Sequence, residues 1–438
     1  MQASSVIERV VRGDPEAASV PSSFDVRFRG PTGSVGPRDV ATHWIHWYPA
    51  KMFHRIPREI MCSLALPKGS LVLDPFCGSG TVLLEGILRG HQAIGTDVNP
   101  LARSISRVKT TPLDCSRLDW LGAAVIRRAR GDASSPAPHP VLDFWFREQS
   151  RAALHRLKRS IDLVEGEDYR EFFLVTLSSI VRRASLADPS IAPPVRMSEQ
   201  RAKLANNRYR MAFSRAQELT SDAVIALYTE RFEANLQRMR QLCSSSGLGA
   251  AQVLEDGEAA STGLPDRSVD LVVTSPPYCG SQKYVRSLRL EMLWLGLPTA
   301  AIAEADRRTL GTERVRIADA CDQLTTPDQA ANNLVQEIQR VNQVRARMLA
   351  DYVKYVYRFV AELARILRLG GSAFVTFGTT HMAGRQVRAD EFFCAAATSV
   401  GLTVLTTLVD AIPSRGLLTR RHATAGRIDD ERVVWVRA

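Results

Sequence analysis

Between residues 71 and 109, two patterns of apolar residues follow one another in turn, one typical of strands and one typical of helices. The short, mainly apolar segments LVLDPF (71–76) and QAIGTDV (92–98) are typical of buried strands. Each run is followed by a segment in which apolar residues recur every three to four positions, which predicts amphipathic helices over 80–90 and 100–109. Pro100 stands at the start of the second helix, where its missing N–H has no intrahelical partner to lose. Strands that alternate with helices in this way predict a parallel sheet.

This alternation stops between residues 112 and 248, where the chain is basic and its pattern is helical. Apolar residues at helical spacing predict long helices over 149–164, 169–185 and 221–243. Since strands resume only after this stretch, we expect an inserted helical domain.

Apolar runs predict five further strands in the rest of the chain, beginning near residues 251, 269, 371, 402 and 431. With the two earlier runs this gives seven strands, which we expect to form a doubly wound, mostly parallel, Rossmann-like α/β sheet. A polar insertion at 297–345 and a long helix over 351–371 separate the fourth predicted strand from the fifth.

We expect the chain to divide into four segments. The first is rich in Ser, Pro and Gly and has few clustered apolar positions, which predicts a flexible arm. The helical insertion splits the α/β domain into two parts. The expected bounds are 1–40 for the arm, 41–111 for the first part of the α/β domain, 112–248 for the insertion and 249–438 for the second part.

The composition indicates what kind of partner the protein binds and in which cellular compartment it works. A formal net charge of +11 favours a polyanionic partner such as nucleic acid, although a merely basic surface would give the same value. The seven cysteines include no C-x-x-C pair, which argues against a disulfide framework or a zinc site and favours a reducing, cytoplasmic compartment. His43 and His46 lie among aromatic residues, so packing explains them better than metal binding. No apolar stretch approaches the roughly 20 residues of a membrane span, and residues 1–20 lack the core of a signal peptide.

The apolar run at 269–273 leads directly into Ser275, Pro276, Pro277 and Tyr278. Proline has no N–H to donate to a sheet and fixes its own φ, so the two prolines end the strand and stiffen the chain. The Ser275 hydroxyl and the carbonyl oxygens of Ser275 and Pro276 then form a rigid edge of acceptors beside an aromatic ring. Such an edge suits a planar group that carries an amino function, and a strand-ending turn is the simpler alternative.

The sequence DPFCGSGT, residues 74–81, lies between the first predicted strand and its helix. Glycines at this place let backbone N–H groups approach a ligand, although a tight turn alone also accounts for them. Asp97 ends the second strand about 20 residues later, where a carboxylate in this architecture accepts the hydroxyls of a ribose. The loop lacks the lysine that would neutralise a triphosphate, and Asp74 would repel a pyrophosphate but could receive an ammonium group. These features favour S-adenosylmethionine as the ligand.

The ordered set DPFCGSGT, GTDVNP and TSPPY resembles the amino-directed DNA methyltransferases, which methylate cytosine N4 or adenine N6. The resemblance covers roughly 46–110 and 250–438, and it implies the class I methyltransferase fold with S-adenosylmethionine as cofactor. The segment 46–60 is similar to the one that packs over the methionine end of the cofactor in this family, and Asp256 would meet the adenine. The expected cofactor-binding residues are Tyr48, Pro49, Ala50, Lys51, Asp74, Phe76, Cys77, Gly78, Ser79, Gly80, Thr81, Asp97, Val98 and Asp256.

The same resemblance gives the strand-ending prolines a chemical role. If the Ser275 side chain and the Pro276 carbonyl accept the two N–H bonds of an exocyclic amino group, its nitrogen can direct its lone pair at the sulfonium methyl. The expected catalytic residues are Ser275, Pro276, Pro277 and Tyr278, the last as a face on which the base stacks. In this family the Ser-Pro-Pro-Tyr form is more often associated with cytosine N4, so methylation there is the expected activity. Adenine N6 methylation, RNA base methylation and a non-catalytic cofactor-binding DNA module are the alternatives.

A base inside a duplex must be flipped out to reach such a pocket, and contacts to phosphates must offset that cost. The basic run at 182–215 could supply them, though such a run can also be only a solvated face. The expected DNA-binding residues are Arg182, Arg183, Arg196, Arg201, Lys203, Arg208, Arg210 and Lys283.

Two features depart from the family pattern. The helical insertion separates the second-strand motif from the third, and Lys283 stands where relatives often have an acidic residue. The resemblance further implies double-stranded DNA as partner, a possible cognate restriction endonuclease, no metal, and a cytoplasmic, nucleoid-associated place in a bacterium or archaeon.

Overall fold

A computed structural model of the chain describes residues 2–12, 23–28, 41–280, 283–312, 324–412 and 430–438. Its centre is an eight-stranded sheet with the strand order β1-β9-β10-β6-β5-β2-β3-β4. Neighbouring strands are parallel except at β10, which runs antiparallel to both β6 and β9. The strands are β1 (Ser23–Val26), β2 (Leu71–Asp74), β3 (Gln92–Thr96), β4 (Ala250–Leu254), β5 (Val269–Thr274), β6 (Leu367–Gly378), β9 (Thr403–Ala411) and β10 (Asp430–Arg437).

The doubly wound, mostly parallel α/β sheet predicted from the sequence is confirmed, with one correction to the number of strands. All seven predicted strands form, and β1 adds an eighth at the β9 edge. A separate hairpin, β7 (Thr380–Met382) and β8 (Arg385–Val387), follows β6.

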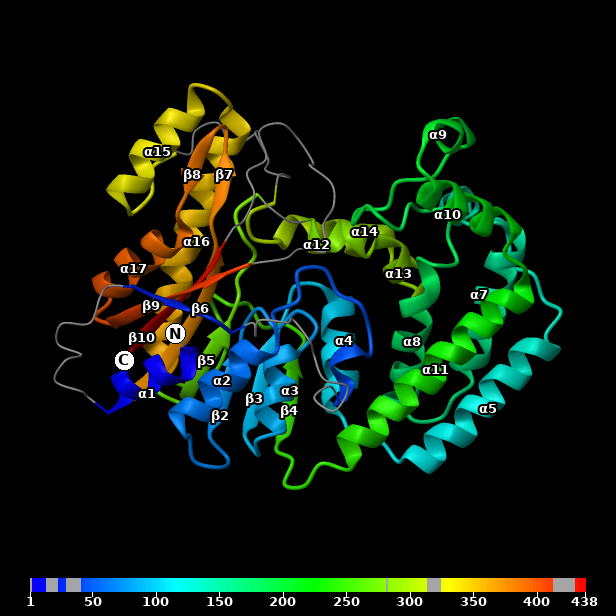
Figure 1. Cartoon of the computed structure of the whole chain (residues 1–438), viewed down its shortest axis with the longest axis horizontal. Helices are drawn as coiled ribbons and strands as arrows, with labels where there is room; N and C mark the ends of the chain where they lie inside the picture. Colours follow the sequence, from blue (N-terminus) through cyan, green and yellow to red (C-terminus); the bar gives the residue numbers. More distant parts are fainter. Residues whose placement is uncertain (1, 13–22, 29–40, 281–282, 313–323, 413–429) are drawn as a thin grey trace.

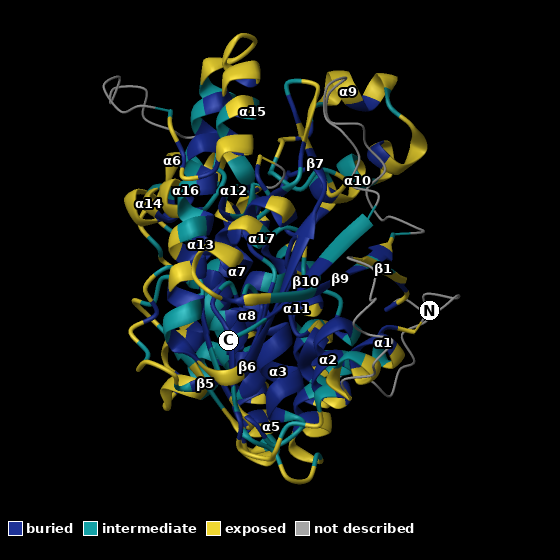
Figure 2. Ribbon diagram, turned by 90° about the vertical axis from the view of Figure 1, so that its left-hand side faces the viewer, coloured by how far each residue is buried: buried dark blue, intermediate teal, exposed yellow. Residues whose placement is uncertain are grey.

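Helices cover both faces of the sheet, because alternate residues of each strand are apolar on opposite sides. On one face Val72, Leu271 and Phe374 pack with α1 (Ala3–Val11) and α2 (Arg55–Leu64). On the other face the next residue of each strand packs against α16 (Gln343–Ile366) and α17 (Ala389–Ser399). Figure 2 shows the central strands coloured as buried between these layers.

The segment expected to be a flexible arm is folded where the structure describes it. Helix α1 buries Ala3 and Ile7 against the sheet, and β1 pairs in parallel with β9 from Ser23 opposite Thr407. The apolar residues of 3–11 recur at helical spacing, which explains the helix. The short β1 is held by its pairing with β9, which is far away in the sequence. Residues 13–22 and 29–40 of the expected arm lie outside the described ranges.

The helical insertion packs beside α4 (Pro100–Thr110), which together with α3 (Thr81–Ile87) belongs to the α/β part (Figure 1). Its hydrophobic core is continuous with that of α3 and α4, and Gly122 lets two of its helices approach, since a Cβ there would lie 2.0 Å from the Phe232 ring. Its helices are α5 (Cys115–Gly131), α6 (Pro140–Trp145), α7 (Glu148–Asp162), α8 (Glu167–Val181), α9 (Glu199–Leu204), α10 (Asn207–Glu218) and α11 (Ser221–Cys243).

The polar insertion between β5 and β6 is also helical where it is described. Its helices are α14 (Thr299–Arg308) and α15 (Gln329–Gln339), and the short helices α12 (Tyr284–Ser287) and α13 (Arg289–Trp294) precede it. Residues of α12 and α14 line one pocket with residues that follow β2, β3 and β5, so these two helices lie at the carboxyl ends of the parallel strands (Figure 1). Ligands of doubly wound sheets bind at this edge.

Candidate active site

The loop between β2 and α3 is shaped by its glycines. Gly78 and Gly80 have φ of 49° and 72°, the left-handed region that side chains rarely adopt. A Cβ on Gly80 would lie within 3.0 Å of Ser106, and one on Gly78 would lie 3.3 Å from the Tyr48 ring. Each glycine is therefore required both for the turn and for the close approach of its neighbour.

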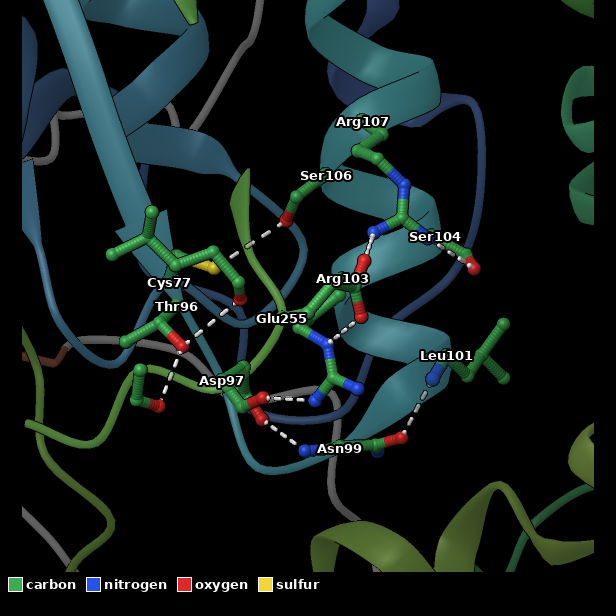
Figure 3. A network of polar contacts seen from close by, with 12 residues as sticks. Cys77, Thr96, Asp97, Asn99, Leu101, Arg103, Ser104, Ser106, Arg107 and Glu255 are labelled. Carbon is green, nitrogen blue, oxygen red and sulfur yellow. Dashed lines mark hydrogen bonds and ion pairs between the residues drawn. The ribbon is translucent and has the colours of Figure 1, made fainter. Parts of the chain in front are cut away.

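Asp97 follows β3 and holds this loop from the adjacent strand. Its Oδ2 accepts a hydrogen bond from the Gly78 N–H at 3.0 Å, and its Oδ1 accepts from the Asn99 N–H at 2.8 Å. Arg103 donates to the Asp97 carbonyl oxygen and to Glu255 (Figure 3). Burial raises the Asp97 pKa to about 6, and the two N–H donors oppose that rise.

Asp74, at the end of β2, connects the cofactor loop with β5. The Thr274 hydroxyl donates to Asp74 Oδ1 at 2.6 Å, and the Phe76 N–H donates to the same oxygen at 3.2 Å. Burial raises the Asp74 pKa to about 7. Thr274 directly precedes Ser275, so this bond fixes the distance between the glycine loop and the strand-ending prolines.

The segment before α2 lies over the same loop. Tyr48 is buried against Gly78, and Lys51 donates to the His43 carbonyl oxygen at 2.5 Å with its ammonium 4.5 Å from the centre of the Trp44 ring. Burial lowers the Lys51 pKa to about 8. His43 itself is buried and forms a hydrogen bond with Glu85 through Nε2 at 2.8 Å. This environment agrees with a histidine that packs in the interior.

The residues after β5 face the neighbouring strands β6 and β10. The Ser275 hydroxyl donates to the Thr376 carbonyl oxygen at 3.4 Å, and the Tyr278 hydroxyl donates to Glu431 Oε1 at 3.3 Å. Burial raises the Tyr278 pKa, so its phenol stays neutral near neutral pH. A hydroxyl oxygen that donates its hydrogen still has lone pairs, so the Ser275 and Tyr278 oxygens can each also accept a hydrogen bond.

One pocket joins the cofactor loop to the strand-ending prolines. Of the residues that the sequence assigned to the cofactor, the pocket lining includes Tyr48, Ala50, Lys51, Asp74, Phe76, Cys77, Gly78, Ser79, Thr81, Asp97 and Val98, and of those assigned to catalysis it includes Ser275, Pro277 and Tyr278. The assigned residues outside the lining are Pro49, Gly80, Asp256 and Pro276.

Asp256, assigned to the cofactor adenine, is exposed, whereas Glu258 lines the pocket. The reason is the turn after β4, where the Thr96 hydroxyl donates to the Gly257 carbonyl at 2.8 Å and Gly257 itself enters the lining. Gly257 immediately before Glu258 was the signal in the sequence that could have found this residue. Sequence reasoning also missed lining residues from distant segments, namely Asn99, Tyr284, Arg308, Tyr355, Thr376 and Glu431.

The residues assigned to DNA do not share one environment. Arg182 is largely buried and donates to the carbonyl oxygens of Asp188, Ala192 and Ser287, so it holds the chain together rather than facing a partner. Arg201 lies 3.8 Å from Asp188 and over the Tyr209 ring.

The other assigned residues lie nearer the surface. Lys203 pairs with Glu199 at 2.9 Å, Arg196 lies over the Phe144 ring, and Lys283 directly precedes α12. The remaining assigned residues, which are exposed, are Arg183, Arg208 and Arg210.

Two further observations concern what the described ranges hold. Within them, no three His, Cys, Asp or Glu side chains gather as the ligands of a metal ion would. No helix of the described residues is both long and apolar enough to cross a membrane.

The fold and the pocket define a class I methyltransferase, and comparison with known proteins narrows this. Residues 40–107 match the N6_N4_Mtase family, described as DNA methylase. Type II methyltransferase M.MvaI of Kocuria varians is 26% identical over 75% of this chain and 74% of its own length. Type II methyltransferase M.AvaI of Anabaena variabilis is 23% identical over 83% of this chain and 80% of its own. The chain is therefore similar to the N4/N6 DNA methyltransferases, through the family match at 40–107 and through type II methyltransferases over most of its length.

The methyl donor of this family is S-adenosylmethionine, and the pocket fits it. Asp97 presents a carboxylate for ribose hydroxyls, and the glycine loop leads into the start of α3, where the first N–H groups of a helix have no partner within the helix. Tyr48 and Lys51 would lie along the bound cofactor, and Glu258 would lie at the end of the pocket nearest β4. Bound there, the cofactor supplies an electrophilic methyl group.

Proposed function

We propose that the protein is a site-specific methyltransferase that transfers a methyl group to the N4 amino nitrogen of cytosine in double-stranded DNA. The observation that carries this proposal is that Ser275, Pro277 and Tyr278 line the same pocket as Asp97 and the glycine loop. A base held by the first group would meet a methyl donor held by the second.

The chemistry asked of the protein is to make a poor nucleophile reactive. The lone pair of an exocyclic amino nitrogen is delocalised into the ring. The Ser275 oxygen accepts one of its N–H bonds, and the carbonyl of Pro276, which stands between the lining residues Ser275 and Pro277, accepts the other. These two bonds direct the lone pair toward the methyl group. The nitrogen forms its bond to the methyl carbon as the sulfur–carbon bond breaks, and it then loses one proton. Positioning supplies most of the acceleration, and no covalent enzyme intermediate is required.

The rigidity of this arrangement comes from contacts on three strands. Thr274 is tied to Asp74 on β2, Ser275 to Thr376 on β6, and Tyr278 to Glu431 on β10. Preorganised acceptors need no rearrangement during the reaction, which is the condition for them to lower its barrier.

The target base must leave the duplex to enter the pocket. We propose that the exposed Arg183, Arg208 and Arg210 of the helical insertion contact phosphates and help offset this cost. Arg182, which the sequence placed in the same group, instead holds the chain together through its bonds to backbone carbonyl groups, whereas Arg201 is exposed beside Asp188.

Two alternatives differ in the base or in the activity. Adenine N6 presents the same amino group beside a ring nitrogen, and the pocket would accept it by the same contacts. A non-catalytic cofactor-binding module is disfavoured because both the acceptor edge and the glycine loop are complete. The curated relatives are named type II methyltransferases, and on that ground we propose that a cognate restriction endonuclease accompanies this protein.

Nucleoside analysis tests the proposal directly. The chain and its Ser275→Ala variant are expressed in a bacterial host without DNA methyltransferases of its own, and the DNA is digested and analysed by mass spectrometry. We expect N4-methyl-2′-deoxycytidine from the unmodified chain and little from the variant. Detection of N6-methyl-2′-deoxyadenosine instead would overturn the cytosine assignment. The absence of both methylated nucleosides would overturn the proposal that the protein methylates DNA. Sequencing that reports modified bases on the same DNA gives the recognition sequence.

A further inference from the structure

One buried hydroxyl in the pocket lacks a hydrogen-bond partner. Thr376 lies in β6, is 2% exposed, and lines the pocket. Among the residues that the structure describes, nothing bonds its Oγ1. An unpaired buried hydroxyl destabilises the folded protein, and such groups in native proteins call for an explanation. A ligand of the pocket would supply the missing partner.

The position of Thr376 in β6 supports this interpretation. Side chains on one face of the strand alternate, so Phe374, Thr376 and Gly378 point to the same side. Phe374 belongs to the hydrophobic core and stacks on Trp435 of β10. Gly378 pairs with Glu431, which lines the pocket. Thr376 is therefore the residue at which this face of the strand passes from core to pocket, and a valine there would pack equally well.

The same residue also supports the acceptor edge. Its carbonyl oxygen accepts from the Ser275 hydroxyl at 3.4 Å, so its side chain lies close to the proposed amino-group site. On the neighbouring strand, Glu431 accepts from the Tyr278 hydroxyl at 3.3 Å. The unpartnered donor is thus beside the acceptors that the reaction uses.

We propose that the Thr376 hydroxyl donates a hydrogen bond to the ring nitrogen next to the amino group of the flipped base, a proposal that rests on the function proposed above. Cytosine N3 and adenine N1 are acceptors at this place. Thymine and guanine carry an N–H there and a carbonyl in place of the amino group. A donor at Thr376 beside acceptors at Ser275 and Pro276 therefore matches the edge of an amino base and opposes that of a keto base.

A substitution cycle with a modified base tests this contact. The duplexes carry the recognition sequence with either the normal target or a target whose ring nitrogen is replaced by C–H, 3-deazacytosine or, for an adenine target, 1-deazaadenine. The enzymes are the unmodified chain, Thr376→Val, which keeps the shape, and Thr376→Ser, which keeps the hydroxyl. Thr406→Val is the matched control, because Thr406 is also a buried threonine of the sheet with an unpartnered hydroxyl but does not line the pocket.

On the normal duplex we expect Thr376→Val to lower kcat/KM by about three- to tenfold, the value of one net hydrogen bond. Thr376→Ser and Thr406→Val should stay within twofold of the unmodified chain. On the deaza duplex, Thr376→Val and the unmodified chain should be equal.

Two results would overturn the contact. One is an equal loss for Thr376→Val on both duplexes, which would make its effect structural. The other is a weaker calorimetric affinity for S-adenosylmethionine in Thr376→Val, which would place the hydroxyl at the cofactor. Failure of the unmodified chain to methylate the normal duplex would instead refute the proposed function, so the two failures are distinguishable.

Discussion

The Gly78 N–H donates to Oδ2 of Asp97 at 3.0 Å, and this bond ties the turn after β2 to the end of β3. The carboxylate that is expected to bind the cofactor ribose therefore also holds the loop that cradles the cofactor. Since both parts of the cofactor site depend on this one side chain, we expect substitution of Asp97 to weaken cofactor binding more than substitution of any other pocket residue.

We expect Asp97→Ala to weaken S-adenosylmethionine binding by about 1–3 kcal/mol, because the ribose hydroxyls and the Gly78 N–H lose their acceptor. Calorimetric titration measures the loss. Tyr278→Phe is the control, since it removes a hydroxyl that bonds Glu431 on the other side of the pocket. Equal losses in the two variants would contradict the division of the pocket into a cofactor part and a base part.

Cofactor affinity should depend on pH through the same carboxyl. Burial raises the Asp97 pKa to about 6, so the group is an acceptor on both oxygens above that pH and gains a proton below it. The contribution of Asp97 to affinity should be nearly complete at pH 7 and above and fall by up to about tenfold for each unit below pH 6. Asp74, with a pKa of about 7 in the same pocket, titrates at a higher pH. In Asp97→Ala this fall should be absent. If Asp97→Ala retains the full pH dependence, a group other than Asp97 is responsible for the titration.

Asp74→Asn should stabilise the fold at alkaline pH. The native pKa of about 7 exceeds the ordinary value of 3.8, so the native state binds more protons than the unfolded chain between those values, and the stability contributed by Asp74 is lost as pH rises through about 7. The amide keeps an oxygen for Thr274 and Phe76. Thermal unfolding should show a gain of roughly 1–3 kcal/mol at pH 8 and a smaller one at pH 5. An equal gain in the free energy of unfolding at pH 8 and pH 5 would show that the charge of the carboxyl group is not the cause.

Ser275→Ala should leave cofactor binding intact and lower the methyl-transfer rate by about 10²-fold, the typical effect of removing one preorganised polar contact in a transition state. Single-turnover assays measure the rate without product release. Ser275→Asp tests what selects the base: if pocket shape does so, this variant should still methylate cytosine weakly in duplexes that contain only that target. A switch to adenine would show that the side chain at 275 makes the choice.

Affinity for DNA should fall steeply with salt, because phosphate contacts release counterions. Neutralising Arg183 and Arg208 to Gln should reduce the slope of log K against log salt by up to about 2, or about 0.9 for each lost contact. The same change at Arg127 and Arg128, exposed residues of α5, is the control and should leave the slope unchanged. If all variants share one slope, the basic run of the insertion is only a solvated surface.

The sequence by itself determined the sheet, the glycine loop with Asp97, and the strand-ending prolines. Each is encoded within a short stretch: apolar runs of strand length, glycines that alone tolerate left-handed φ at 78 and 80, and prolines that stop a strand at 276 and 277. The chain's own local preferences therefore predicted these parts. They also indicated that the insertion is helical, though not how its core joins that of α4.

Only the tertiary structure decided which distant residues complete the site. Thr376 and Glu431 follow their partners Ser275 and Tyr278 by 101 and 153 residues. They reach the pocket because β6 lies beside β5 in the sheet and β10 lies beside β6. The same holds for the basic run, in which Arg182 turns inward to backbone carbonyl groups while Arg183, its neighbour, stays exposed. Local sequence fixes what a side chain can do, but its partner is set by strand order and packing, which bring together residues that no local pattern connects.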